Sequence, residues 1–150
     1  MTRKVAREIA VHLSFETGIN PMGTQELFDT MFDPEYFSTL SSEYEIYAEY
    51  PDELQMAYIR RLSGGIGEHL AELDTYIEKY AMNWKMGRIS RVAVAIMRIC
   101  MYEVLYMPDI PDAAAVNEAV ELTKKYEEPE VVAFVNGILG GFIRGEKSFG

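Results

Sequence analysis

Apolar residues recur three and four positions apart along most of the chain, and this period restricts the possible folds more than any other feature. Such a spacing gathers side chains on one face of an α-helix. Alternation of apolar and polar residues, which marks a half-buried strand, does not extend over a useful length. The sequence therefore predicts an all-α fold with about seven helices, at 3–15, 24–31, from 34, 53–80, 91–107, 111–126 and from 129.

Capping residues support the ends of several of these helices. Thr24 and Ser90 are suitable N-caps, and Asp33 precedes a proline that would occupy the first helical position. An acid and a proline at 128–129 repeat this signature before the last helix. Residues 41–51 show no clear period, so they are predicted to form an acidic loop that carries tyrosines.

Glycines interrupt two of the predicted helices. Those at 64, 65 and 67 either kink the helix over 53–80 or let a neighbour pack closely without breaking it. Glycines at 137, 140 and 141 indicate close approach of another helix to the last one. The apolar face of the helix over 53–80 is predicted to consist of Leu54, Ala57, Tyr58 and Leu62.

Length and cysteine content exclude several classes of protein. The chain has 150 residues, which favours one domain, and its single cysteine, Cys100, excludes an internal disulfide framework. The most apolar stretch, over 92–107, is shorter than the ~20 residues that a bilayer requires, and it contains Arg98 and Glu103. We expect a cytoplasmic protein without membrane contacts.

The formal net charge of −10 is unevenly distributed. Residues 1–12 carry three bases against one acid, whereas 13–58 contain ten acids and neither lysine nor arginine. The remaining 92 residues are close to neutral, with 11 bases and 13 acids. Because salt confines electrostatic fields to ~8–10 Å, the first residues can form a local basic patch on an otherwise acidic protein.

Candidate catalytic groups are few, and each has a simpler explanation. Glu8, His12 and Glu16 lie four apart on one helix, but such a set is more often a solvated face than a metal or acid–base site. The glycines at 64–67 lack the lysine and the preceding strand of a phosphate-binding loop. Cys100 lies in the most apolar helix and is expected to be an inert buried thiol. We therefore expect a binding protein and no enzyme, metal or cofactor.

Two charged residues in apolar helices are predicted to have a structural role. Burial of an unpaired charge is costly, so Arg98 is expected to pair with Glu118 or with a helix end. The alternative is that both side chains extend to solvent along their apolar stems.

Three stretches in the second half of the chain form motifs. They are Trp84-x-x-x-Arg88-Ile89-Ser90-Arg91-Val92 followed by Ile96-Met97-Arg98 and Tyr102-Glu103, then Val116-Asn117-Glu118-Ala119-Val120-Glu121-Leu122-Thr123-Lys124, and Phe134-Val135-Asn136-Gly137-Ile138-Leu139. With the basic start Arg3-Lys4-Val5-Ala6-Arg7-Glu8, they resemble the NusB family in this order over the whole length. The resemblance also assigns Asn117 to the structural set with Arg98 and Glu118.

The resemblance implies both a fold and a function. The fold is all-α, with two packed helical subdomains at about 1–82 and 83–150. The function is that of a transcription antitermination factor, which binds boxA RNA together with the ribosomal small-subunit protein NusE and supports rRNA transcription. Other antitermination factors and, indirectly, RNA polymerase are the further partners that it implies.

Several residues follow as candidates for RNA contact. Arg3, Lys4 and Arg7 are spaced to form one basic edge that neutralises about three phosphates. Phe134 and Asn136, from the family motif, are candidates for base stacking and base-edge contacts, although core packing is an equal alternative for the ring. Further phosphate contacts are expected from Lys85, Lys124 and Lys125, where the alternative for the last two is stabilisation of a helix C-terminus.

The resemblance also points to partner contacts and to departures from the family. Phe15, Arg88 and Glu130 are the partner-binding candidates; Phe15 replaces the family's tyrosine. Ala93 and Val94 replace an acid and a base, and the acid belongs to the family's NusE interface.

Two alternatives to this function remain open. In one, the protein is an adaptor with little RNA binding of its own, whose acidic segment 13–58 recruits a basic partner. In the other, it is a separate copy of the NusB-like module of rRNA cytosine methyltransferases, which the lack of a cofactor-binding domain after this chain's helices disfavours.

Overall fold

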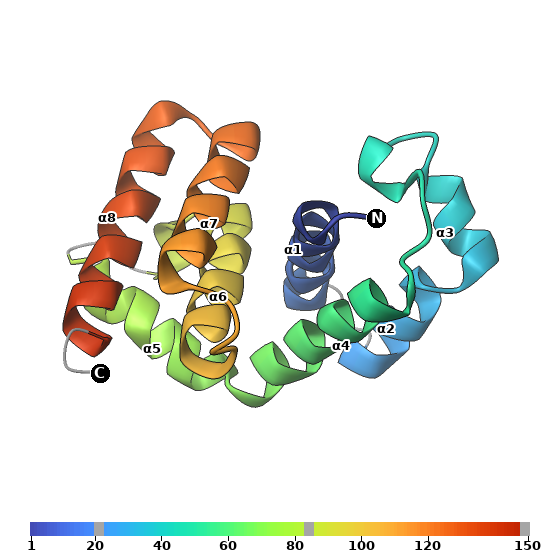
Figure 1. Ribbon diagram of the computed structural model, residues 1–150. Helices are drawn as coiled ribbons and strands as arrows, with labels where there is room; N and C mark the ends of the chain where they lie inside the picture. The colour runs from blue at the N-terminus through green and yellow to red at the C-terminus, as the bar shows by residue number, and fades with distance from the viewer. Residues whose placement is uncertain (20–22, 83–85, 148–150) are drawn as a thin grey trace. The chain divides into compact units, whose positions relative to one another are not determined.

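The computed structural model describes residues 1–19, 23–82 and 86–147, and its regular elements are all helical (Figure 1). The predicted all-α fold is thus confirmed. The described residues contain eight α-helices rather than about seven, because the helix expected over 53–80 is interrupted at His69. α4 spans Glu53–Glu68 and α5 spans Leu70–Tyr80.

The chain forms two compact units, Met1–Gly67 and Glu68–Gly150, called here the N-terminal and C-terminal units. The boundary falls earlier than the division at 82/83 that the sequence predicts. The reason is the packing of α5, which lies against α6 and α8 and so belongs with the C-terminal helices.

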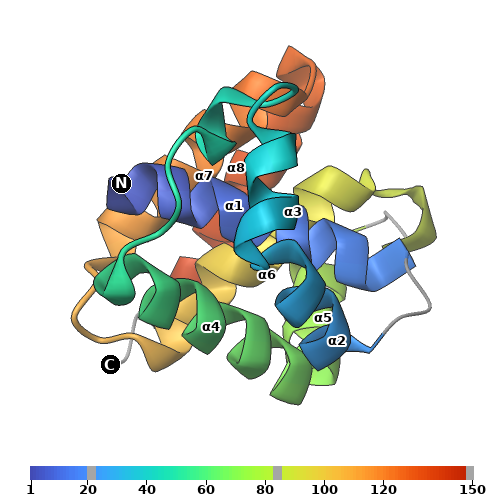
Figure 2. The same cartoon turned by 90° about the vertical axis from the view of Figure 1, so that its right-hand side faces the viewer.

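The N-terminal unit contains α1 (Arg3–Ile19), α2 (Thr24–Met31), α3 (Pro34–Leu40), the 3-10 turn η1 (Glu45–Tyr47) and α4. α2 and η1 pack against α1, and α3 packs against both α2 and η1. Figure 2 shows the non-helical segment that leads from η1 to α4. The core of this unit is built from Ala6, Ile9, Leu13, Leu27, Phe28, Phe37, Ile59 and Leu62.

Local capping explains how two of these helices start. Asp33 is the N-cap of α3, as predicted, and its side chain accepts a hydrogen bond from the backbone N–H of Tyr36 at 3.0 Å. α2 starts differently from the prediction, because Gly23 holds the N-cap position and Thr24 is the first helical residue. Gly23 provides no side-chain cap.

The segment 41–51 is a loop for most of its length, as predicted, but its centre packs into the unit. Tyr47 in η1 is buried, and its hydroxyl lies 3.0 Å from Nδ1 of His12. The rings of Phe37 and Tyr47 meet edge to face at 5.2 Å. His12 therefore takes part in an aromatic cluster with Tyr44 and Tyr47.

α4 buries a different face from the one predicted. Tyr58 and Leu62 are buried as expected, but Leu54 is 68% exposed and Ala57 is also exposed. The buried side of α4 consists of Gln55, Tyr58, Ile59, Leu62 and Ile66, which share one helical face. Hydrophobicity alone predicts the wrong face, because the polar Gln55 is buried while the apolar Leu54 and Ala57 are exposed.

The C-terminal unit contains α5, the 3-10 turn η2 (Met86–Arg88), α6 (Arg91–Tyr106), α7 (Asp112–Tyr126) and α8 (Pro129–Glu146). α6, α7 and α8 pack against one another, and α5 packs against α6 and α8 (Figure 1). Ser90 is the N-cap of α6, as predicted. In α6 the side chains from Ala93 to Met97 and from Ile99 to Val104 are buried, so this helix is the centre of the unit.

Arg98 pairs with Asp74 of α5, and not with Glu118 as the sequence suggested. Its Nε and Nη2 donate to the two carboxylate oxygens of Asp74 at 2.8 and 2.9 Å. The pair is partly buried, with the two side chains 17% and 26% exposed. Two parallel charge-assisted hydrogen bonds give this pair a fixed geometry that joins α5 to α6.

Glycines in α8 admit the ring of Tyr80 from α5. A Cβ atom at Gly141 would lie 3.1 Å from Cδ1 of Tyr80, and one at Gly145 would lie 1.9 Å from its hydroxyl oxygen. That hydroxyl donates to Glu146, which also accepts a hydrogen bond from Lys79. Close approach is thus confirmed at Gly141, whereas a Cβ at Gly137 would meet nothing within 4 Å.

In the part of the chain that the structure describes, we find no helix with the length and apolar character needed to cross a membrane.

Replacement of Gly145 by alanine is expected to destabilise the protein by about 1–2 kcal/mol, because the new methyl group displaces Tyr80 from Glu146. Gly137→Ala is the matched control and is expected to stabilise by about 0.5–1 kcal/mol, since its methyl group enters open space in a helix. Urea unfolding measures both; equal effects would contradict the close contact.

A double-mutant cycle tests the ion pair. Arg98→Met and Asp74→Ala are expected to couple by about 1–2 kcal/mol, as a bidentate, partly buried pair should. Arg98→Met and Glu118→Gln are expected to be additive within about 0.5 kcal/mol. A larger coupling to Glu118 than to Asp74, measured by urea unfolding, would restore the pairing that the sequence suggested.

Candidate nucleic-acid interface

The basic start of α1 is shaped by the residue before it. The hydroxyl and carbonyl oxygens of Thr2 accept hydrogen bonds from the backbone N–H groups of Val5 and Ala6 at 3.1 and 3.0 Å. The N-terminal ammonium lies 2.6 Å from Glu49. These contacts fix the backbone of the first turn of α1, from which Arg3 and Lys4 project.

Arg3 is held in place by α4. Its Nε donates to Oε1 of Gln55 at 2.8 Å, and its Cζ lies 3.9 Å from the centre of the Tyr58 ring. Both contacts orient the guanidinium without neutralising it, and Arg3 forms no ion pair within the described part of the chain. A positioned cation that keeps its charge is suited to a phosphate contact.

The three bases do not form the single exposed edge that the sequence suggests. Arg7 is only 6% exposed, and its Cζ lies 5.8 Å from the same Tyr58 ring. Arg3 is partly exposed and Lys4 fully so. The reason is helical geometry: residues 3 and 7 share the face that meets Tyr58, while position 4 turns outward. Lys4 and part of Arg3 are thus the accessible bases of this set.

A second cluster lies in the C-terminal unit, around a cavity of about 150 Å³. Its lining brings together Arg88 of η2 with Glu130 and Phe134 of α8, and is completed by Ile89, Ser90 and Val131. The sequence predicts partner binding for Arg88 and Glu130 and RNA contact for Phe134. The structure places all three in the lining of one cavity. Arg88 and Glu130 are exposed, and Phe134 is partly exposed.

Ser90 links the elements that form this cavity. Its hydroxyl oxygen accepts a hydrogen bond from the backbone N–H of Ala93 at 3.3 Å, which starts α6, and the hydroxyl donates to Glu127 at the end of α7. Pro129 then begins α8, with Glu130 in its first turn. One residue therefore holds the start of α6 beside the connection between α7 and α8.

Phe134 and Asn136 do not face the same way. Both lie in α8, two positions apart, which corresponds to a turn of about 200° around the helix axis. Asn136 is exposed, and Phe134 borders the cavity. A nucleotide stacked on the ring would therefore need to bend around α8 to reach the amide.

The lysines at the end of α7 are exposed but have local partners. Lys124 pairs with Glu121 at 3.1 Å, and the ammonium of Lys125 lies 5.6 Å from the ring centre of Tyr126. Both lie in the last turn of α7, where a cation interacts favourably with the helix dipole. Their position thus fits the structural alternative as well as a phosphate contact.

The other candidates are placed as follows. Phe15 is partly buried in α1, Asn117 is exposed in α7, and Glu118 is partly buried beside it. Lys85 lies outside the described residues. Of the described candidates for RNA contact, Arg3, Lys4 and Arg7 belong to the N-terminal unit, and Lys124, Lys125, Phe134 and Asn136 to the C-terminal unit.

Sequence reasoning missed two residues that position Arg3. Gln55 and Tyr58 lie more than 50 positions away along the chain, and neither carries a pattern that would associate it with the basic start. Ala93 and Val94 are buried, at 0% and 7% exposure, in the helix that the apolar stretch 92–107 predicts. Apolar residues suit those positions, because a charge there would need a buried partner.

The described elements define an all-α protein of two helical units. A model of the NusB family matches residues 4–144 of the sequence. The chain belongs to the NusB family, and the assignment made from its motifs is confirmed.

Relatives resemble the chain over nearly its full length. A transcription antitermination protein NusB of Clostridium kluyveri is 37% identical over 153 residues, covering 98% of both chains. One of Clostridium botulinum is 34% identical over 143 residues, covering 95% of this chain and 100% of its own.

Solved structures share the fold. NusB of T. maritima gives a TM-score of 0.79 at 25% identity and covers 97% of this chain and 92% of its own. A chain in a crystal structure of the antitermination factors NusB and NusE with dsRNA gives 0.73 at 22% identity, covering 95% and 96%, and supports the fold alone.

Proposed function

We propose that this chain is a transcription antitermination factor that binds boxA-type single-stranded RNA together with a NusE-type ribosomal protein. It would support rRNA transcription in the cytoplasm, with other antitermination factors and, indirectly, RNA polymerase as partners. The observation that carries the proposal is the full-length similarity to proteins named transcription antitermination protein NusB. A solved structure with the same fold contains NusB, NusE and dsRNA, and these are the two kinds of partner that the proposal names.

The start of α1 supplies the electrostatic part of the proposed RNA contact. Lys4 is exposed, and Arg3 is oriented by Gln55 and Tyr58 while it keeps its charge. Each phosphate that such a base neutralises on a single strand adds ~0.7 to the slope of log affinity against log salt. Two such contacts give weak binding that does not distinguish between sequences.

The cavity in the C-terminal unit supplies the part that would read bases. The partly exposed ring of Phe134 offers a stacking surface, and Arg88 lies beside it in the same lining. An unpaired base that stacks on an aromatic ring gains about 1–3 kcal/mol, which exceeds the contribution of one exposed charge. Phe134 would therefore contribute more to the affinity for RNA than any single lysine or arginine of α1.

Glu130 is the residue through which a basic ribosomal protein would meet this cavity. It is exposed at the N-terminal end of α8, and Arg88 lines the same hollow. Ala93 and Val94 carry no charge and are buried, so they offer no charged contact at those two positions. We infer that contact with the NusE-type protein depends instead on Glu130 and Arg88, the exposed charged residues that line the cavity.

An RNA titration tests the proposal. With the NusE-type protein present, Lys4→Ala is expected to lower the salt slope for a labelled boxA-type RNA by ~0.7, because one phosphate contact is lost. Phe134→Leu is expected to weaken binding by at least ~5-fold at unchanged slope, because stacking is lost and charge is not. Fluorescence anisotropy at two salt concentrations measures both quantities.

Arg144→Ala is the matched control for the first variant, because Arg144 is an exposed cation outside the proposed contacts. It is expected to leave affinity and slope unchanged. If both cation variants have the same effect, or if RNA binds only through the NusE-type protein, the protein is the adaptor that the acidic segment suggested as an alternative.

Partner binding is tested separately. Glu130→Gln is expected to weaken binding of the NusE-type protein by about 3-fold at low salt and by less at high salt, as for an exposed ion pair. Glu78→Gln, another exposed acid on a helix, should have no effect. Calorimetry without RNA measures both; equal weakening by the two variants would show that only the net charge matters.

A further inference from the structure

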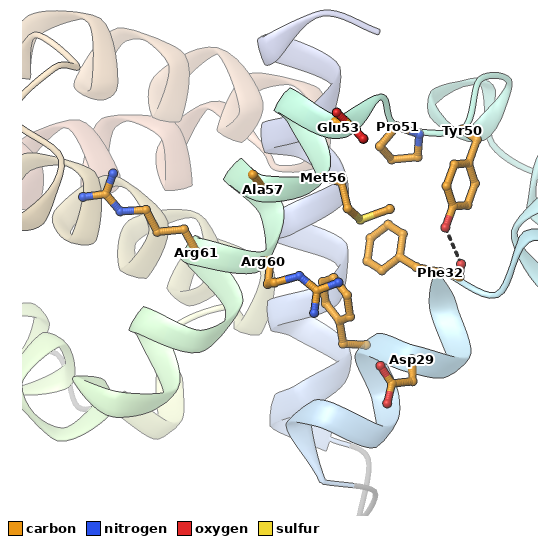
Figure 3. A pocket seen from close by; sticks show the side chains of 10 residues that line it. Asp29, Phe32, Tyr50, Pro51, Glu53, Met56, Ala57, Arg60 and Arg61 are labelled. Carbon is orange, nitrogen blue, oxygen red and sulfur yellow. Dashed lines mark hydrogen bonds between the residues drawn. The ribbon is translucent and has the colours of Figure 1, made fainter.

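The N-terminal unit has a groove of about 720 Å³ to which the proposed function gives no role (Figure 3). α2, the segment at Tyr50 and Pro51, and α4 form its walls. All of its lining residues belong to the N-terminal unit.

The floor of the groove is apolar. It is lined by Phe28 of α2, by Phe32 at the C-cap of α2, and by Met56 and Ala57 of α4. Figure 3 shows the side chains of Met56 and Phe32 turned toward each other. Ala57 is exposed although hydrophobic periodicity predicts its burial. The floor is thus an apolar surface that the unit itself does not cover completely.

One wall of the groove is fixed by a hydrogen bond. The hydroxyl of Tyr50 donates to the backbone carbonyl oxygen of Phe32 at 2.5 Å, while the tyrosine as a whole is 41% exposed. The ring of Tyr50 also meets that of Phe37 edge to face at 5.1 Å. These contacts preform the wall, so an incoming side chain pays little ordering cost.

Carboxylates lie on both sides of the apolar floor. Figure 3 shows Glu53 above Met56 and Phe32, and Asp29 below them. Both acids are exposed. Arg60 also lines the groove, and its guanidinium stacks on Phe28, with Cζ 4.5 Å from the ring centre.

The segment that supplies α2 and the wall at Tyr50 and Pro51 is strongly acidic, whereas α4 adds two bases, Arg60 and Arg61, to the lining. Within the segment that lacks lysine and arginine, nine acids are exposed, namely Glu26, Asp29, Asp33, Glu35, Glu43, Glu45, Glu49, Asp52 and Glu53. The net negative charge of this segment attracts partners of positive charge and repels nucleic acid. The face therefore favours a cationic polypeptide over a second RNA strand.

We propose that this groove binds a basic polypeptide segment in which a bulky apolar side chain is flanked by lysine or arginine. The apolar side chain enters between Phe32, Met56 and Ala57. The flanking cations pair with Glu53 and Asp29, the two acids that form the rim of the groove. The acidic face raises the rate of encounter, and the apolar contact at the centre supplies specificity.

Four labelled peptides test the proposal on the whole protein by fluorescence anisotropy. GKKFLKKG carries the anchor and the cations, GKKGGKKG the cations alone, GSSFLSSG the anchor alone, and GEEFLEEG the anchor with acids. The first is expected to bind at least ~10-fold more tightly than each of the others, because it alone satisfies floor and rim. A ten-nucleotide oligo-uridine is the nucleic-acid probe.

Two pairs of variants separate the groove from the acidic face. Ala57→Gln fills the groove without a change of charge and is expected to weaken binding of GKKFLKKG at least ~5-fold, whereas Ala114→Gln, at an exposed alanine of α7, should not. Asp29→Asn with Glu53→Gln removes two rim charges, and Glu35→Gln with Glu43→Gln removes two charges elsewhere on the acidic face. The rim pair is expected to weaken binding at least ~3-fold more than the other pair.

The proposal fails if the anchor makes no difference between the two basic peptides, or if Ala57→Gln binds like Ala114→Gln. Equal effects of the two charge pairs would likewise reduce the interaction to a general attraction. Binding of oligo-uridine that Ala57→Gln abolishes would make the groove a nucleic-acid site instead. None of these outcomes bears on the boxA titration, because that experiment depends on α1 and on the cavity of the C-terminal unit.

Discussion

The burial of α6 is the constraint on which the C-terminal unit depends. Its side chains are buried from Ala93 to Met97 and from Ile99 to Val104, so nearly every side of the helix must be covered by other elements. α5, α7 and α8 provide that cover. Because Ser90 starts α6 and also bonds to the end of α7, the same packing creates the cavity that holds Arg88, Glu130 and Phe134.

The N-terminal unit is stabilised in another way. Its helices bury one face each, and aromatic rings fill the spaces among α1, α3 and η1, with Tyr47 in contact with both His12 and Phe37. Burial and the nearby charges raise the pKa of Tyr47, so this hydroxyl stays protonated and able to bond to His12. The polar face left outside carries the acids, and the partly covered groove lies among them.

Local signals predicted the helices well, and long-range contacts escaped them. The caps at Asp33 and Ser90 were correct because capping depends on residues only three positions apart. The partner of Arg98 was wrong, since Asp74 lies 24 positions away in a helix whose approach no local pattern encodes. For the same reason the burial of Arg7 and the support of Arg3 by Gln55 and Tyr58 were not foreseeable.

The sequence by itself determined the all-α class, the order of the helices and membership of the NusB family, because periodicity, caps and motifs are properties of short stretches. Tertiary structure alone decided which face of α4 is buried, which bases of α1 stay accessible and which residues share a cavity. Those features depend on how helices far apart in the chain pack together, and packing selects among faces that are equally helical.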